Sequence, residues 1–142
     1  MQANLYWHNQ RASGLLSLLN LAGWTLRIYQ GTMPQVTDIS GGFTLATYAS
    51  QLLIAYAVNP ATCFARTSDN YQRVFMSNVP TPVAATGTGT ATWFSLLYST
   101  STYVIVGDVT DATGTAALKL FTTNIVSGTI YPIYSFAFQL HQ

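Results

Sequence analysis

The stretch Thr90-Ala-Thr-Trp-Phe-Ser-Leu-Leu-Tyr98 opens a longer run, Thr86–Leu140, that decides the fold. Along this run, β-branched, aromatic and apolar residues are interrupted at regular intervals by Gly, Asp, Asn and Ser. That pattern is typical of consecutive antiparallel strands joined by short turns. Residues 91–98 are apolar at both odd and even positions, so we expect a central strand that is covered on both faces.

The last strand expected in this run is Ile130–Leu140. Its alternation places one set of residues on one face (Ile130, Tyr134, Phe136, Phe138 and Leu140) and another set on the opposite face (Ser135, Ala137, Gln139 and His141). Pro132 has no backbone N–H to give to a ladder, and it therefore predicts that the strand begins at a sheet edge or a bulge. Upstream of it, Leu118–Leu120 is expected to point both leucines inward and the lysine between them outward.

The N-terminal half adds an arm, a helix and further strands. Residues 1–12 form a polar arm carrying Leu5, Tyr6 and Trp7, which either folds back on its own domain or docks on a neighbouring subunit. The apolar spacing in residues 13–23 predicts a short helix that begins at Ser13 and ends at Gly23.

A strand over Trp24–Tyr29 follows, with alternate residues on a half-solvated outer face. Phe43–Ala49 and Gln51–Val58 are expected to form two strands or one bent strand. The candidate interface residues are Leu5, Tyr6, Trp7, Tyr29 and Met33.

Together these segments predict an all-β protein with seven to nine strands, because strands recur every eight to twelve residues without βαβ alternation. The expected architecture is a single antiparallel β-sandwich of jelly-roll or immunoglobulin size, formed by residues 13–142 with the short leading helix. Residues 1–12 are the separate N-terminal arm.

The composition favours a subunit of an assembly. Only 6% of the 142 residues are charged, the formal net charge is +1, and 49% are hydrophobic. A free soluble domain carries about 25% charged residues. A transmembrane helix is not expected, because the apolar run Leu15–Ala22 is much shorter than the roughly 20 residues that a membrane span needs. We also expect no secretion signal at the N-terminus, and the lone Cys63 allows no internal disulfide.

No constellation for catalysis or for cofactor binding is evident, and we predict a protein that is not an enzyme. His8 and His141 lie in opposite tails, so neither accompanies Cys63 as a catalytic pair. Asp108 and Asp111 are expected to be turn residues, with weak Ca²⁺ binding as the alternative. The five basic residues are scattered, which predicts no nucleic-acid partner. Thr86-Gly-Thr-Gly-Thr90 resembles a phosphate loop but leads into a strand and lacks the Lys-Ser/Thr that follows one.

Several motifs resemble those of short proteins encoded among the virion genes of tailed bacteriophages. That family shares a Leu-rich helix ending in Gly and then Leu-x-Ile-Tyr-x-Gly-Thr-x-Pro, which Leu26–Pro34 matches. Further matches are Gly-Thr-Ala-Thr-Trp-Phe at Gly89–Phe94 and Ser-Phe-x-Phe at Ser135–Phe138. Three others lie between these two: Gly107–Gly114, Leu118–Leu120 and Ile125–Gly128.

The resemblance implies a structural component of a phage particle, found in the virion after synthesis in the host cytoplasm. A capsid decoration (cement) protein is the expected role, with the major capsid protein or another virion subunit as partner and further copies of the chain as neighbours. The alternative is a tail- or fibre-associated module that recognises a host surface glycan or another virion protein. Neither role involves a membrane, a cofactor or a metal.

Overall fold

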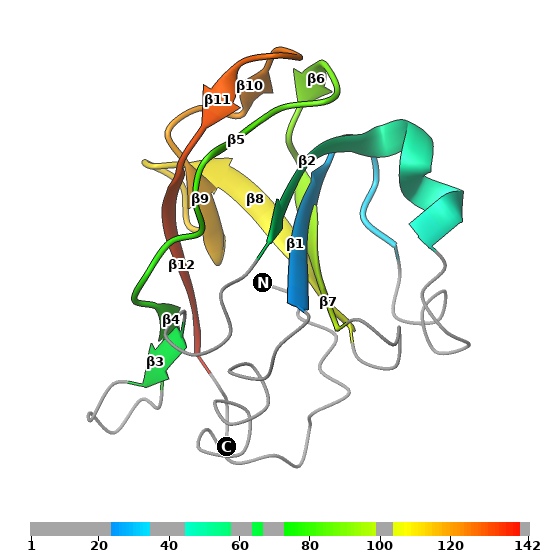
Figure 1. Cartoon of the computed structure of the whole chain (residues 1–142). Coiled ribbons are helices and arrows are strands. Elements are labelled where there is room, and N and C mark those ends of the chain that lie inside the picture. Colours follow the sequence, from blue (N-terminus) through cyan, green and yellow to red (C-terminus); the bar gives the residue numbers. More distant parts are fainter. Residues whose placement is uncertain (1–23, 35–44, 58–63, 67–72, 99–103, 140–142) are drawn as a thin grey trace.

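A computed structural model describes residues 24–34, 45–57, 64–66, 73–98 and 104–139. The described chain consists mostly of β-strands (Figure 1), which confirms the prediction of an all-β fold. The strands are β1 (Trp24–Tyr29), β2 (Leu52–Ala57), β3 (Phe64–Arg66), β4 (Arg73–Met76), β5 (Val83–Ala84), β6 (Gly89–Thr90), β7 (Trp93–Tyr98), β8 (Val104–Asp111), β9 (Leu118–Leu120), β10 (Asn124–Ile125), β11 (Ile130–Tyr131) and β12 (Ile133–Gln139).

Eight of these strands form one curled sheet in the order β2-β1-β7-β8-β9-β12-β4-β3. Every neighbouring pair is antiparallel except β8 and β9, which run parallel with Val109 opposite Leu118. The prediction of a purely antiparallel sheet is therefore wrong at this pair. The connection between β8 and β9 carries the chain back alongside the end of β8. β9 therefore starts beside β8 and runs in the same direction. Residue pattern predicts strands but not their direction.

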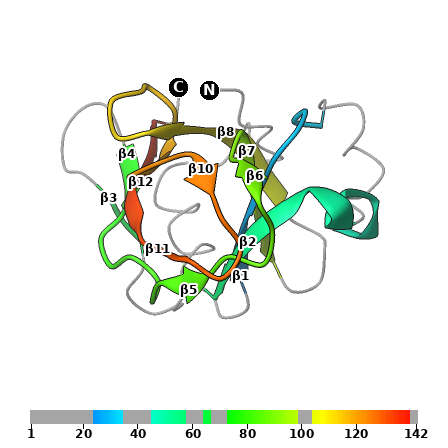
Figure 2. The same cartoon turned by 90° about the horizontal axis from the view of Figure 1, so that it is seen from above.

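The four remaining strands are two residues long and lie along the rim of the curled sheet (Figure 2). β10 pairs with β6, and β11 pairs with β5. These short strands account for the difference between the twelve strands described and the seven to nine predicted. Gly128, at φ 87°, ends a tight turn between β10 and β11, where Thr129 N–H donates to the Val126 carbonyl over 3.1 Å. A positive φ at this position favours glycine.

The main core lies inside the curl, where residues from distant strands meet. Phe94 of β7 packs edge-to-face against Phe136 of β12, with ring centroids 5.0 Å apart. Phe64 of β3 packs against the same ring at 5.9 Å. Gly107 of β8 lies opposite Phe94, and a Cβ there would come within 2.8 Å of that ring. The curl thus buries both ends of the sheet against its middle.

β7 has a second apolar cluster on its other face, as residues 91–98 predict. Phe94 and Leu96 belong to the main core, while Trp93 and Leu97 belong to an outer aromatic cluster. The outer aromatic cluster is formed by Tyr29, Trp93, Leu97 and Val106, with Met33, Tyr48 and Leu52 packed against it. The prediction of a central strand covered on both faces is confirmed.

The 3₁₀ helix η1 (Leu45–Gln51) helps to cover this outer cluster. Its Tyr48 meets the Trp93 ring edge-on, with centroids 5.3 Å apart. The predicted strand Phe43–Ala49 is wrong over residues 45–49, because the contact of Tyr48 with the outer aromatic cluster outweighs local strand propensity. The arm at residues 1–12 and the helix at 13–23 lie outside the described residues.

Candidate functional site: an exposed apolar stripe on β11 and β12

Exposed apolar side chains gather in one segment of the described chain. Five large hydrophobic residues are exposed, and four of them fall within residues 121–134. No charged residue occurs between Lys119 and the C-terminal end of the sequence. The five are Val79 (48% exposed), Phe121 (61%), Val126 (55%), Ile130 (61%) and Tyr134 (49%).

Burial alternates strictly along β11 and the start of β12. Tyr131 and Ile133 are buried, whereas Ile130, Pro132 and Tyr134 are exposed. Successive side chains of an extended chain point to opposite faces, so the three exposed residues share the outer face over roughly 13 Å. The following four residues are called the apolar stripe: Phe121, Ile130, Pro132 and Tyr134.

A β-bulge at Tyr134 separates this outer face from the rest of β12. Ile133 lies opposite Leu120 and Ser135 opposite Lys119, so Tyr134 is an extra residue without a partner on β9. Bulges commonly redirect a side chain in this way. The prediction that Ile130 and Tyr134 share one face with Phe136 is wrong, because Phe136 is buried on the opposite face, beyond the bulge. Pro132 correctly indicated an edge or a bulge close by.

The bulge also brings two exposed rings together. Phe121, directly after β9, meets the Tyr134 ring at an interplanar angle of 88° with centroids 5.1 Å apart. This edge-to-face arrangement is a favourable geometry for two aromatic rings. Because both rings remain about half exposed, they form a corner of apolar surface outside the sheet.

The backbone beneath the stripe is held by two hydrogen bonds at Tyr131. The Tyr56 hydroxyl donates to the Tyr131 carbonyl over 2.7 Å, and the Val126 N–H donates to the Tyr131 hydroxyl over 2.8 Å. The Tyr56 bond is buried, and burial raises the pKa of the Tyr56 hydroxyl above its usual range. The hydroxyl therefore stays protonated and keeps donating. The stripe consequently rests on a fixed backbone.

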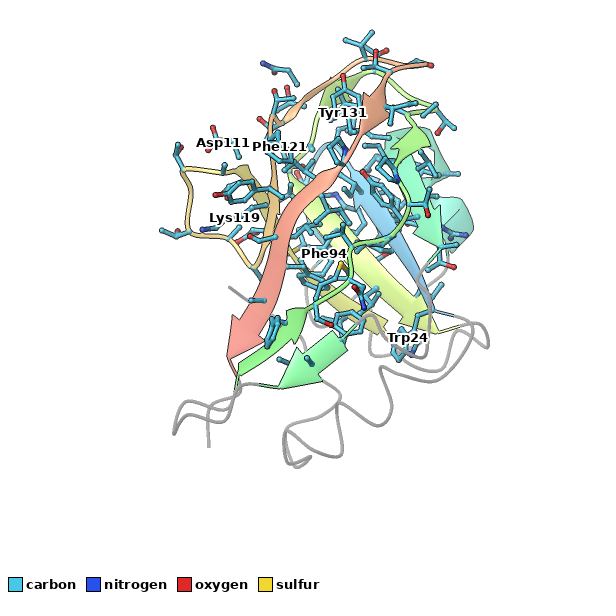
Figure 3. All side chains as sticks on the ribbon, turned by 60° about the vertical axis from the view of Figure 1, so that its left-hand side comes forward. Trp24, Phe94, Asp111, Lys119, Phe121 and Tyr131 are labelled. Atoms are coloured by element: carbon cyan, nitrogen blue, oxygen red, sulfur yellow. The ribbon has the colours of Figure 1, made fainter. Side chains whose placement is uncertain are left out.

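Charged groups lie at the aromatic end of the stripe. Lys119, the single lysine of the chain, is opposite Ser135, next to Tyr134. Figure 3 shows Lys119, Phe121 and Asp111 at one side of the molecule, with Phe94 among the core side chains. Hydrogen bonds from the hydroxyl and then the backbone N–H of Thr113 hold the pKa of Asp111 below its usual value.

The predicted interface residues fall elsewhere. Leu5, Tyr6 and Trp7 lie outside the described residues. Tyr29 is only 1% exposed, because it stacks on Trp93 with ring centroids 4.0 Å apart and lies within the outer aromatic cluster. The half-solvated outer face predicted for this residue is therefore wrong.

Met33 is half-buried against the same cluster, so it lies at the surface only in part. The sequence did contain signals for the stripe in Pro132 and in the absence of charge after Lys119. Neither signal identifies which face of the strand is exposed.

Of the two aspartates considered for chemistry, Asp111 serves a turn, whereas Asp108 lies within β8 opposite Trp93, so the turn predicted for Asp108 is wrong. The Asp111 Oδ1 accepts from the N–H and the hydroxyl of Thr113, at 3.0 Å and 2.6 Å, as a turn residue does. Residues 89–90 form β6, so the glycine-rich stretch leads into a strand as predicted. In the described part of the chain, no three His, Cys, Asp or Glu residues gather as metal ligands would. His8, His141 and Cys63 are not among those residues.

Comparisons with protein-family models, with curated proteins and with solved structures found no match for this chain. Among the described residues, no helix combines the length and the apolar character needed to cross a membrane. Any functional conclusion therefore has to rest on the residues of this chain and on the surface that they form.

Proposed function

We propose that this protein is a non-enzymatic structural subunit of a bacteriophage particle, a capsid decoration protein that reinforces the shell through contacts between subunits. The observation that carries the proposal is the apolar stripe, an exposed and uncharged surface on a fixed backbone. Contiguous apolar surface of this kind marks protein interaction sites. Its partner is the major capsid protein or another virion subunit, and it is located in the virion.

The low charge of the whole chain supports the same conclusion. A protein with 6% charged residues and a net charge of +1 has little electrostatic protection against association. If part of this weakly charged surface is buried between subunits, it is no longer available for nonspecific association. Many modest contacts on one particle also act together, because each bound subunit raises the effective concentration of the next contact.

The phage setting is supported by the sequence motifs, above all Leu26–Pro34 and Gly89–Phe94, which resemble those of small virion proteins. The proposal includes the finer sequence expectations. Residues 13–23 form a leading helix, and the arm with Leu5, Tyr6 and Trp7 reaches a neighbouring subunit. The two halves of the curled sheet, which meet at Phe94 and Phe136, serve as the layers of a β-sandwich.

The test is to locate the protein in purified particles. Particles of the phage that encodes this chain are banded by density, and the chain is quantified by mass spectrometry against the major capsid protein. We expect a fixed ratio of copies in wild-type particles and a loss of at least half of them with Tyr134→Asp. Val79→Asp, which changes an exposed apolar residue outside the stripe, should leave the ratio unchanged. A chain that is abundant in the lysate and missing from particles contradicts the proposal.

A second candidate is a tail- or fibre-associated module that recognises a host surface glycan. The observation that favours it is the corner formed by Phe121 and Tyr134, because exposed aromatic rings can stack on the apolar face of a sugar. A glycan array probed with wild-type protein and with Phe121→Ala tests this role. Binding that disappears in the variant supports it, and an array without signal removes it.

A further inference from the structure

We infer that the apolar stripe binds the same stripe of a second copy of this chain, in a two-fold contact with Pro132 near the axis. Cyclic dimers are the commonest protein assemblies, and their interfaces pair one patch with itself. The inference rests on the proposed structural role and deepens it by naming one partner. Three properties of the stripe support this occupant.

The first property is charge. A patch that meets its own copy brings like charges together unless it carries none, and residues 120–139 carry none. The charged groups that neighbour it in the sheet are Lys119, opposite Ser135, and Asp111, opposite Leu120, both at the aromatic end. A two-fold axis at Pro132 places the two Lys119 residues at opposite ends of the contact. Self-association is therefore not opposed by charge repulsion.

The second property is the shape of the stripe. One end carries two large rings, Phe121 and Tyr134, and the other end carries the smaller Ile130. In an antiparallel two-fold contact, Ile130 of each copy faces the aromatic end of the other copy. Large side chains then meet small ones at both ends, which is how packed layers interdigitate. A parallel arrangement would instead oppose ring to ring and Ile130 to Ile130.

The third property is rigidity. The Tyr56–Tyr131 hydrogen bond and the turn at Gly128 fix the backbone that carries Ile130 and Pro132. A surface that is already ordered loses less conformational entropy on binding. Four side chains nevertheless form less than the roughly 800 Å² per partner of a standard interface. We therefore expect a weak dimer in solution, with a dissociation constant in the micromolar range, that a particle lattice strengthens.

The first experiment measures self-association of the full chain by sedimentation velocity over a wide concentration range. Wild type should shift from monomer to dimer as concentration rises. Tyr134→Asp should weaken the dimer by at least about tenfold, because it places two carboxylates in an apolar contact. Val79→Asp is the matched control and should dimerise as wild type does. Circular dichroism verifies that each variant is folded.

The second experiment reports on geometry and does not depend on weakening the dimer. In a Cys63→Ser background, Pro132→Cys should be joined to its copy by a short bis-maleimide cross-linker, because the two residues meet near the axis. Tyr134→Cys should react far less, since its two copies lie about 13 Å apart along the strands. Efficient linking at position 134 with none at 132 overturns the arrangement.

The outcomes also separate this inference from the proposed function. A chain that stays monomeric at every concentration, and that is still present in particles, overturns the self-contact and leaves the structural role intact. A chain that dimerises but is missing from particles supports the self-contact and contradicts the proposed structural role. If Tyr134→Asp dimerises as strongly as wild type while folded, the stripe is not the self-contact and the inference is wrong.

Discussion

Two aromatic pairs on the same sheet differ in what covers them. Tyr29 and Trp93, on β1 and β7, stack in parallel with centroids 4.0 Å apart and are almost fully buried. Phe121, directly after β9, and Tyr134, on β12, meet edge-to-face at 5.1 Å and remain about half exposed. The first pair is covered by residues of its own chain, Met33 and Tyr48 among them. The described chain provides no such cover for the second pair.

The difference shows that an aromatic residue on a sheet does not by itself mark a core or an interface. Both pairs lie on the outer face, away from the main core around Phe94. The two pairs differ in burial because η1, in the segment between β1 and β2, packs against the pair on β1 and β7. The pair without a cover in the described chain is the better candidate for a contact with another molecule, because its apolar area is exposed to solvent.

The largest expected effect is the difference in stability between the two pairs. Trp93→Ala should lower the free energy of unfolding by about 3–5 kcal/mol, because it removes a buried ring and leaves a cavity. Phe121→Ala should lower it by less than about 1 kcal/mol, because that ring is 61% exposed. Urea denaturation of the monomer, followed by circular dichroism, measures both. Equal decreases in unfolding free energy for the two variants would mean that the two aromatic pairs are buried to the same extent.

The next effect tests the cover itself. Tyr48→Ala removes the ring that meets Trp93 edge-on, and it should cost about 1–2 kcal/mol from the lost ring contact and partial burial. Acrylamide should also quench tryptophan fluorescence more strongly, because Trp93 becomes accessible. Tyr48→Phe retains the ring and serves as the control. If Tyr48→Ala leaves both stability and quenching unchanged, η1 does not provide the cover.

The sequence predicted much of the fold because strand patterns are local. The bounds of β1 agree with the predicted strand, and β7 is covered on both faces as its two-sided apolar pattern indicates. Lys119 lies between two buried leucines as predicted. Each of these features depends on alternation within one strand, which can be read from six or seven residues.

The sequence did not predict which of two tyrosines, Tyr29 and Tyr134, is exposed. Tyr29 was expected on a half-solvated face, and it is buried. Tyr134 was expected on the same face as Phe136, but Tyr134 is exposed whereas Phe136 is buried. Tyr29 is buried by η1, which approaches from another part of the chain. Tyr134 and Phe136 face opposite ways because a one-residue bulge at Tyr134 inverts every later position of the strand. Neither event leaves a local signature beyond Pro132.

The smallest expected effect concerns the turn that precedes β9 and Phe121. Hydrogen bonds from Thr113 lower the pKa of Asp111 from its ordinary value of 3.8. A lowered folded-state pKa means that the ionised carboxylate stabilises the fold above the ordinary pKa, and that this contribution is lost as the pH falls through the lowered one. Wild type and Asp111→Asn should therefore differ in unfolding free energy by a constant amount from pH 7 to pH 5, and the difference should shrink below about pH 4.

Thr113→Val removes the largest cause of the pKa shift and should abolish most of that pH dependence. The same denaturation measurement, repeated at each pH, follows all three proteins. The effect is small because the carboxylate is fully exposed and its bonds are local to residues 111–114. The turn at Asp111 thus depends on short-range contacts, whereas the cluster at Trp93 depends on packing between distant segments. A pH dependence that survives in Thr113→Val would mean that another group controls the Asp111 carboxylate.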